Sequence, residues 1–181
     1  MNIGSMAGPL GSTQNYIVYI ALGNCVDYFY LKKKHEEENL SSTSEKYKEV
    51  RYYLNAVESL NNILDYFYYE NESSLSHHRN VESFRKSVHE KYSELETVAN
   101  IANAYKHCVR ENHKGKNTNL PWARDLQNPE IVVNMNLANK TTEVKFNFNW
   151  PIKEQEEALE SAWKFWNSYQ SDPISQELIS A

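Results

Sequence analysis

A run of apolar residues at helical spacing between residues 44 and 70 limits what this chain can fold into more than any other feature. The run consists of Val50, Leu54, Val57, Leu60 or Asn61, Leu64 and Tyr68, and Tyr53 and Phe67 widen it. Steps of three and four residues place these side chains on one face of an α-helix. Ser42 and Glu45 stand ahead of it at the spacing of a capping box. We therefore expect one long amphipathic helix, from about Ser44 to Glu70, whose apolar face other elements must cover.

Four further segments carry helical patterns. They cover about residues 24–38, 78–91, 93–115 and 151–169. The apolar face of the first is marked by Val26, Phe29 and Tyr30, that of the third by Leu95, Val98, Ala102, Tyr105 and Val109, and that of the last by Ile152, Leu159, Ala162, Trp163, Trp166 and Tyr169. Residues 15–22 are ambiguous, because their Tyr, Ile and Val suit a short buried strand and could equally begin the first helix.

Between residues 130 and 150 the apolar period changes to two. Ile131, Val133, Met135 and Leu137 alternate with polar or opposite-facing residues, and so do Val144, Phe146, Phe148 and Trp150. Turn-forming residues over 138–143 join the two runs, which predicts an antiparallel β-hairpin with one apolar face. An isolated hairpin is marginal in water, so we expect it to lie on the helices, with residues 15–22 as an optional third strand.

The predicted organisation is one mainly α domain over residues 13–171, a bundle of about five helices with the hairpin at 130–150. Residues 1–12 include Gly4, Gly8, Pro9 and Gly11 and resemble a flexible leader or the remnant of a cloning linker. Asp172 and Pro173 follow the last helix and are expected to stop it, so residues 172–181 are interpreted as a C-terminal tail.

Composition narrows the class of protein. Hydrophobic residues make up 40% of the 181 residues and aromatic residues 13%, which is enough to build a core and excludes global disorder. The net charge of −5 argues against a dedicated duplex-DNA binder, which needs a broad cationic face. Cys25 and Cys108 form no CxxC motif, and the apolar stretch 16–22 is far short of the roughly 20 residues that span a bilayer. We expect a cytoplasmic protein with reduced thiols and no membrane contact.

One polar stripe in the helical segment 93–115 is unusual. Glu96, Asn100, Asn103, His107 and Arg110 recur at steps of four and three, with Lys106 beside them. The simpler interpretation is a solvated polar face. The alternative is a seam that lines a groove or a dimer interface, and in that case His107 is a candidate acid–base, Arg110 a phosphate-binding residue and Asn103 an orienting residue.

Other site chemistries find little support in the sequence. Adjacent helical residues point about 100° apart, so His107 and Cys108 do not face one metal ion together. We expect no metal and no cofactor, because the chain also lacks a phosphate-binding glycine loop and a serine-hydrolase elbow. The clustered Tyr66, Tyr68 and Tyr69 suit the end of a packed helix better than a base-stacking surface.

The segment from Leu95 to His107, Leu-Glu-Thr-Val-Ala-Asn-Ile-Ala-Asn-Ala-Tyr-Lys-His, resembles the corresponding helix of HEPN-type helical bundles. More narrowly, it resembles bacterial proteins with an Ala-Asn-Ala-x-Lys-His helix. Residues 52–66 look like the matching second helix, and residues 163–166 are similar to the closing segment. The resemblance covers roughly residues 24–170 and implies a HEPN-like bundle.

Active HEPN proteins, often RNases, toxins or phage-defence components, carry an Arg about four to six residues before the motif His. Here His107 matches that His, but residues 101–103 are Ile, Ala and Asn. The resemblance therefore implies a non-catalytic or degenerate HEPN-like protein that acts through self-association as a homodimer and through a protein partner, in bacterial stress or defence.

Two alternatives stay open. The first is a metal-independent HEPN-type endoribonuclease with His107 and Arg110 across a dimer cleft, and only this alternative makes RNA a partner. The second is a small-ligand-binding bundle capped by the aromatic hairpin face of Phe146, Phe148 and Trp150.

Overall fold

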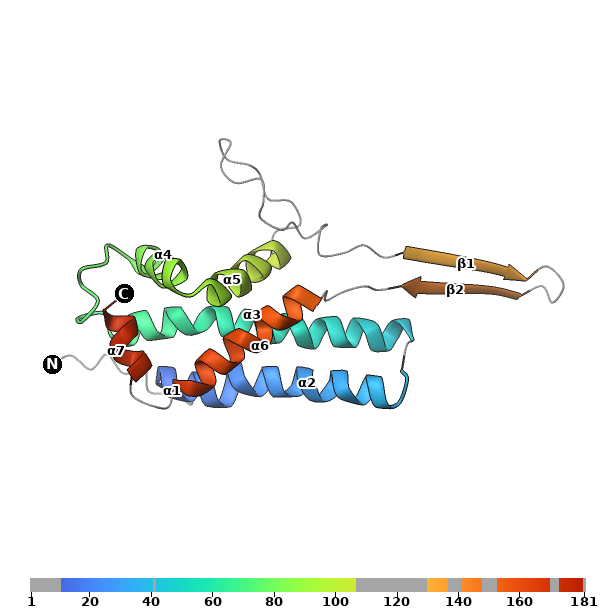
Figure 1. Ribbon diagram of the computed structural model, residues 1–181, viewed down its shortest axis with the longest axis horizontal. Helices are drawn as coiled ribbons and strands as arrows, with labels where there is room; N and C mark the ends of the chain where they lie inside the picture. Colours follow the sequence, from blue (N-terminus) through green and yellow to red (C-terminus); the bar gives the residue numbers. More distant parts are fainter. Residues whose placement is uncertain are drawn as a thin grey trace, which may run out of the picture.

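The longest helix, α3 (Thr43–Glu70), runs through the middle of the helical part of the chain (Figure 1). The computed structural model describes residues 11–40, 42–106, 130–136, 141–147, 153–169 and 173–180, and every structural statement below is limited to them. Ser42 caps the helix, since its hydroxyl oxygen accepts a hydrogen bond from the Glu45 backbone N–H at 3.3 Å. The buried side chains include Tyr53, Ala56, Val57, Leu60, Ile63, Leu64 and Phe67. The long helix predicted from the apolar stripe is confirmed.

The N-terminal segment is helical from Thr13 onward. It comprises α1 (Thr13–Tyr16), a π-helical turn η1 (Ile17–Ala21) and α2 (Leu22–Glu37). Asn39 ends it with a φ of 52°, and the backbone N–H of Leu40 donates to the His35 carbonyl oxygen at 2.9 Å, as in a Schellman cap. The ambiguity at residues 15–22 is thus resolved in favour of helix, and the idea of a third strand there is wrong.

The buried face of α2 differs from the predicted one. Leu22, Cys25, Tyr28 and Leu31 are buried against the rest of the bundle, whereas Val26 and Tyr30 are exposed and Phe29 is half-buried. The prediction failed because α2 carries apolar residues on opposite sides, so spacing alone did not identify the covered side.

Helices α4 (Val81–Lys91) and α5 (Ser93–Lys106) lie on the side of α3 opposite to α2 (Figure 1). Asn80 and Ser83 form a reciprocal capping box, so α4 begins at Val81 and not at His78. Leu95, Val98 and Ala102 of α5 are buried, as the stripe predicted. Tyr92, which separates the two helices, packs its ring on Phe165 of α6.

Helix α6 (Lys153–Ser168) crosses the bundle obliquely and contacts α2, α3 and α5 (Figure 1). Its buried residues Leu159, Ala162 and Trp166 follow the predicted stripe. Residues 173–179, expected as part of a tail, form helix α7 (Pro173–Ile179) with Leu178 buried. Pro173 is the first residue of α7, a position that proline favours.

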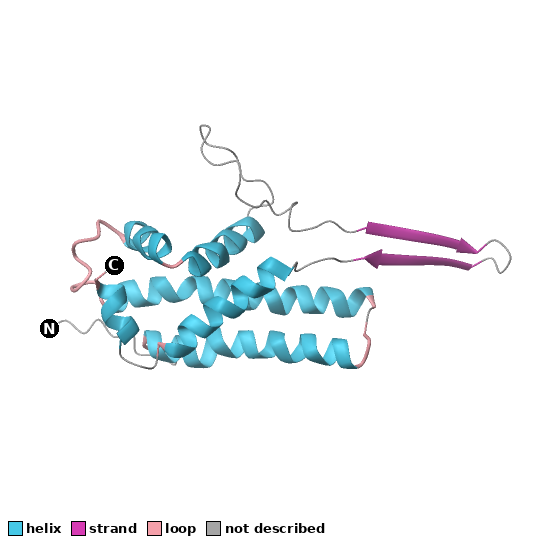
Figure 2. Cartoon of the chain, in the orientation of Figure 1, coloured by secondary structure: helices cyan, strands magenta, loops and turns pink. Residues whose placement is uncertain are grey.

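Strands β1 (Glu130–Asn136) and β2 (Thr141–Asn147) pair antiparallel, with Val133 opposite Val144. They extend beyond the end of the helices instead of covering them (Figure 2). The expectation that they lie on the bundle is therefore not met. Phe148 and Trp150, proposed to cap a ligand pocket, lie outside the described residues, as do Leu137 of the first predicted strand and residues 138–140 of the expected turn.

Candidate functional site

The predicted polar seam lies on α5, and the structure describes only its first half. Glu96 is exposed, whereas Asn100 and Asn103 are half-buried between the buried residues Ala99, Ile101, Ala102 and Ala104. Lys106 is the last residue of α5, and its side chain is not described. His107 and Arg110 lie outside the described residues, so the structure does not bring the candidate catalytic set together.

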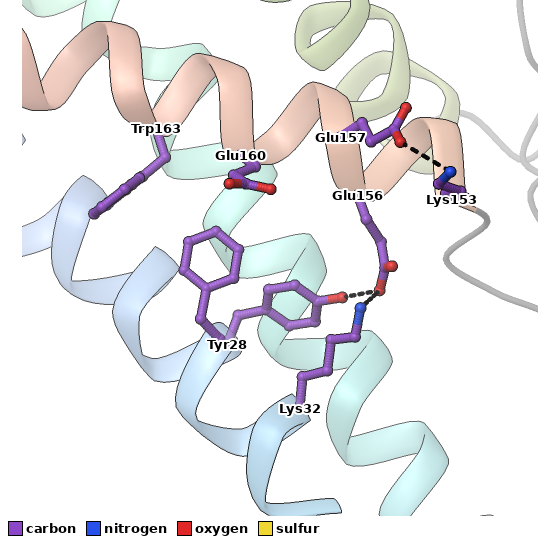
Figure 3. Close-up of a pocket in the computed structure, with 8 residues that line it drawn as sticks. Tyr28, Lys32, Lys153, Glu156, Glu157, Glu160 and Trp163 are labelled. Carbon is purple, nitrogen blue, oxygen red and sulfur yellow. Dashed lines mark hydrogen bonds and ion pairs between the residues drawn. The ribbon is translucent and has the colours of Figure 1, made fainter. Parts of the chain in front are cut away.

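A different concave surface stands between α2 and α6, which we call the α2–α6 groove. It encloses about 430 Å³ and is lined by Tyr28, Phe29 and Lys32 of α2 and by Lys153, Glu156, Glu157, Glu160 and Trp163 of α6 (Figure 3). Tyr28 and Lys32 are one helical turn apart, and so are Glu156 and Glu160. Because the two helices cross, the Tyr28–Lys32 pair of α2 and the Glu156–Glu160 pair of α6 line opposite sides of the groove.

The polar end of the groove centres on Glu156. Its Oε1 accepts hydrogen bonds from the Tyr28 hydroxyl at 2.8 Å and from the Lys32 ammonium at 2.5 Å (Figure 3). Burial, together with the nearby Glu156 charge, raises the pKa of Tyr28 well above its ordinary range, so the phenol stays protonated and serves as a donor. Just beneath, the Tyr53 hydroxyl donates to the Gln155 carbonyl oxygen at 3.0 Å. These contacts fix α6 on α2 and α3.

The other end of the groove is aromatic. The Phe29 and Trp163 rings meet edge to face at 5.8 Å, and both side chains are half-buried. Glu160 stands between this aromatic pair and Glu156 (Figure 3). Its carboxylate is 2.6 Å from the Lys164 ammonium, one turn along the same helix, and both side chains are more than half exposed. The groove thus combines an apolar wall with a carboxylate that is open to solvent.

Two further polar clusters hold helices together. The buried His35 ring of α2 places Nδ1 3.0 Å from Glu49 and Nε2 2.8 Å from Glu45, both on α3. Arg85 of α4 contacts Asp65 of α3 through Nε and Nη2, at 2.9 and 3.1 Å. In each cluster the polar groups contact one another across a helix pair, which suits a structural role.

The groove residues offer binding chemistry more readily than catalysis. None of the described residues that line it is Ser, Thr, Cys or His, and Glu156 is already bonded to two donors. No group of three or more His, Cys, Asp or Glu residues within the described part of the chain is arranged to hold a metal ion. Likewise, none of the described helices is long and apolar enough to cross a membrane.

The sequence held weak signals for this groove. Trp163 belongs to the predicted apolar stripe of the last helix, and no pattern in the sequence singles out Lys32. The regular spacing of Glu156, Glu160 and Trp163 was visible, but such a pattern also fits an ordinary exposed face. The sequence does not show that α2 lies opposite these α6 residues. That contact joins residues more than a hundred positions apart, such as Lys32 and Glu156.

Comparisons with known proteins return no match: no family model fits the chain, and no curated protein and no solved structure is significantly similar to it. The HEPN-like identity therefore remains a prediction from the α5 segment.

Proposed function

We propose that this chain is a non-catalytic, HEPN-like helical protein that acts by self-association and by holding a protein partner in the α2–α6 groove. The observation that carries the proposal is the composition of the groove, an aromatic wall beside a solvent-open carboxylate. A partner segment that places an apolar side chain next to a basic one fits both features.

Charge favours a basic segment over an acidic one. Three carboxylates, Glu156, Glu157 and Glu160, line the groove against two amines, Lys32 and Lys153. The Lys153–Glu157 and Glu160–Lys164 pairs are exposed pairs within one helix. Such pairs contribute only about 0.3–0.5 kcal/mol, so an incoming ammonium or guanidinium group displaces the intrahelical partner at small cost.

The aromatic wall adds affinity for the same segment. An aliphatic or aromatic side chain of the partner removes the half-exposed Phe29 and Trp163 rings from water. A cation that approaches the face of an indole gains about 0.5–1 kcal/mol at an exposed site. Both contributions come from residues adjacent to Glu160, which places the apolar and the basic contact within one short segment.

A peptide titration tests the groove. The probe is a short peptide of alternating leucine and lysine, compared with the same peptide in which glutamate replaces lysine, and binding is measured by calorimetry. We expect the lysine peptide to bind and Glu160→Gln to weaken it about threefold to fivefold. Glu90→Gln is the matched control, because Glu90 forms the same kind of exposed pair, with Lys86, away from the groove. Equal binding of the two peptides, or an equal loss in both variants, contradicts the proposal.

A nuclease assay tests the non-catalytic part. Structured RNA is incubated with the pure protein in EDTA, beside the His107→Ala variant. We expect no cleavage by either protein. Cleavage by the wild type that disappears in His107→Ala would replace the binding function with the metal-independent RNase alternative.

A further inference from the structure

The outer face of the continuous η1–α2 helical segment carries large apolar side chains that nothing in the described structure covers. Tyr19 is 74% exposed, Val26 53% and Tyr30 71%. Helix α2 packs on α3 and α6, and it forms the edge of the bundle in Figure 1. Scattered single apolar residues are normal on a surface, but three along one helix form a continuous stripe.

The spacing of these residues has an internal symmetry. Tyr19, in the π-helical turn η1, is followed at steps of four, three and four by Gly23, Val26 and Tyr30 of α2. A tyrosine stands at each end, and a glycine and a valine stand in the middle. No atom lies within 4 Å of the point where a Cβ of Gly23 would be, so Gly23 is an open notch beside the Val26 knob.

We propose that a second copy of this chain binds along this stripe, with the two α2 helices antiparallel about a two-fold axis between Gly23 and Val26. In that arrangement Tyr19 of each copy meets Tyr30 of the other, and Val26 of each copy enters the notch at Gly23 of the other. Each contact occurs twice, as an isologous interface requires. The inference rests on the self-association part of the proposed function and names the surface that carries it.

Charge selects the antiparallel orientation. From Thr13 to Glu37 the helical backbone is continuous, and the proposed axis falls at its middle. Antiparallel pairing places Lys33 and Glu37 of each copy opposite the N-terminal turns of the other, and residues 13–24 carry no charged side chain, so no like charges meet. Parallel pairing instead aligns Lys33 with Lys33 and Glu37 with Glu37, and such like-charge contacts are unfavourable.

The surface area that the stripe can bury predicts a weak, reversible dimer. A covered aromatic side chain buries about 150–250 Å², so two tyrosines and a valine that are partly exposed offer roughly 400 Å² per copy and about 800 Å² in total. Stable dimers bury roughly 1,200 Å² or more, and the low end of this scale belongs to transient contacts. We therefore expect a dissociation constant on the order of 100 µM for the dimer.

Sedimentation of the full chain over a range from about 10 µM to 1 mM tests the inference. We expect the wild type to shift from monomer to dimer and the double variant Tyr19→Ser/Tyr30→Ser to remain monomeric. Tyr69→Ser is the matched control, because Tyr69 is 60% exposed on α3 and lies outside the stripe. Circular dichroism verifies that each variant keeps its helix content, and Val26→Glu provides a second disruption of the same face.

The outcomes separate this inference from the proposed function. A wild type that stays monomeric to 1 mM, as expected if another segment or another partner covers the stripe, overturns both the α2 interface and self-association. A dimer that Tyr19→Ser/Tyr30→Ser and Val26→Glu leave intact overturns the α2 interface alone. The peptide titration of the groove is independent of both results.

Discussion

The two faces of α2 differ in how the fold uses apolar residues. On the inner face Cys25, Tyr28 and Leu31 are buried, and Tyr28 is only 1% exposed. On the outer face Tyr30, two positions later, is 71% exposed. Both tyrosines have the same apolar ring and the same hydroxyl group. Their energetic contribution therefore depends on what covers them, and among the described residues only the inner face is covered.

This difference assigns the two faces to separate tasks. The inner face holds the bundle together, through the edge-to-face contact of Tyr28 with Tyr53 at 5.3 Å and through its hydrogen bond to Glu156. None of the described residues covers Val26 or Tyr30 on the outer face, so we expect this face to contribute little to folding. Substitutions on the two faces should therefore change different measured quantities.

The largest contrast is expected in stability. Tyr28→Ala removes a fully packed aromatic ring and should lower the free energy of unfolding by about 3–5 kcal/mol. Tyr30→Ala should change it by no more than about 0.5 kcal/mol in dilute solution, where the monomer dominates. Urea denaturation measures both. Similar losses in the two variants would show that the outer face is packed in the monomer.

Thiol reactivity should separate neighbouring positions of the same helix. Burial raises the pKa of Cys25 to about 12, so almost none of it is thiolate at pH 8. In the folded protein it should react with an aromatic disulfide reagent more than about a thousandfold slower than a free thiol. A cysteine introduced by Val26→Cys, on the outer face, should react like a free thiol. Mass spectrometry after a timed pulse assigns the label to each site, and fast labelling of Cys25 would contradict the inner-face assignment.

The same contrast applies to polar side chains at the end of α2. His35 is buried between Glu45 and Glu49, whereas the Lys33–Glu37 pair is mostly exposed. His35→Ala removes the ring that bridges Glu45 and Glu49 and leaves the buried Glu49 carboxylate to Lys46 at 3.5 Å, so it should cost about 1–3 kcal/mol. Lys33→Ala should cost less than about 0.5 kcal/mol. Thermal unfolding of the two variants compares them, and an equal cost would mean that the His35 cluster adds nothing beyond a surface ion pair.

The smallest expected effect is a dependence of stability on pH that arises from α4. Burial, with the nearby Arg85 charge, lowers the pKa of His89 below its ordinary value of 6.5. The unfolded chain then binds the proton more readily, so this contribution to stability is present above about pH 6.5 and is lost as the pH falls below it. Denaturant midpoints between pH 5 and 7.5 should fall toward acid less steeply in His89→Gln than in the wild type. An unchanged slope would place His89 in a solvent-like environment.

The sequence predicted the helices well and their partners poorly. The stripes of α3, α5 and α6 could be identified because each helix has one dominant apolar side, and residues such as Val57, Val98 and Trp166 are buried as expected. Helix α2 could not be interpreted in this way, because it has apolar residues on two sides and their spacing does not show which side is buried. Pro173 was ambiguous for a related reason, since proline both ends one helix and begins the next.

The groove was beyond sequence reasoning because it depends on a long-range crossing. Lys32 and Glu156 show no relation in the sequence, and only the oblique path of α6 brings them together. The seam on α5 was visible, but its candidate catalytic residues His107 and Arg110 lie outside the described residues. Local spacing thus identified elements, whereas the surfaces between elements required the structure.

The most direct test of the two-faced account of α2 is a distance between spin labels in the dimer. Labels are attached at Glu37→Cys or at Asp27→Cys in a Cys108→Ser background, with Cys25 protected by its burial. At a helical rise of 1.5 Å per residue, antiparallel pairing places the two Glu37 positions about 37 Å apart along the axis and the two Asp27 positions about 8 Å apart. We therefore predict a long distance for the first label and a short one for the second. A short distance at position 37, or a long one at position 27, would contradict the interface.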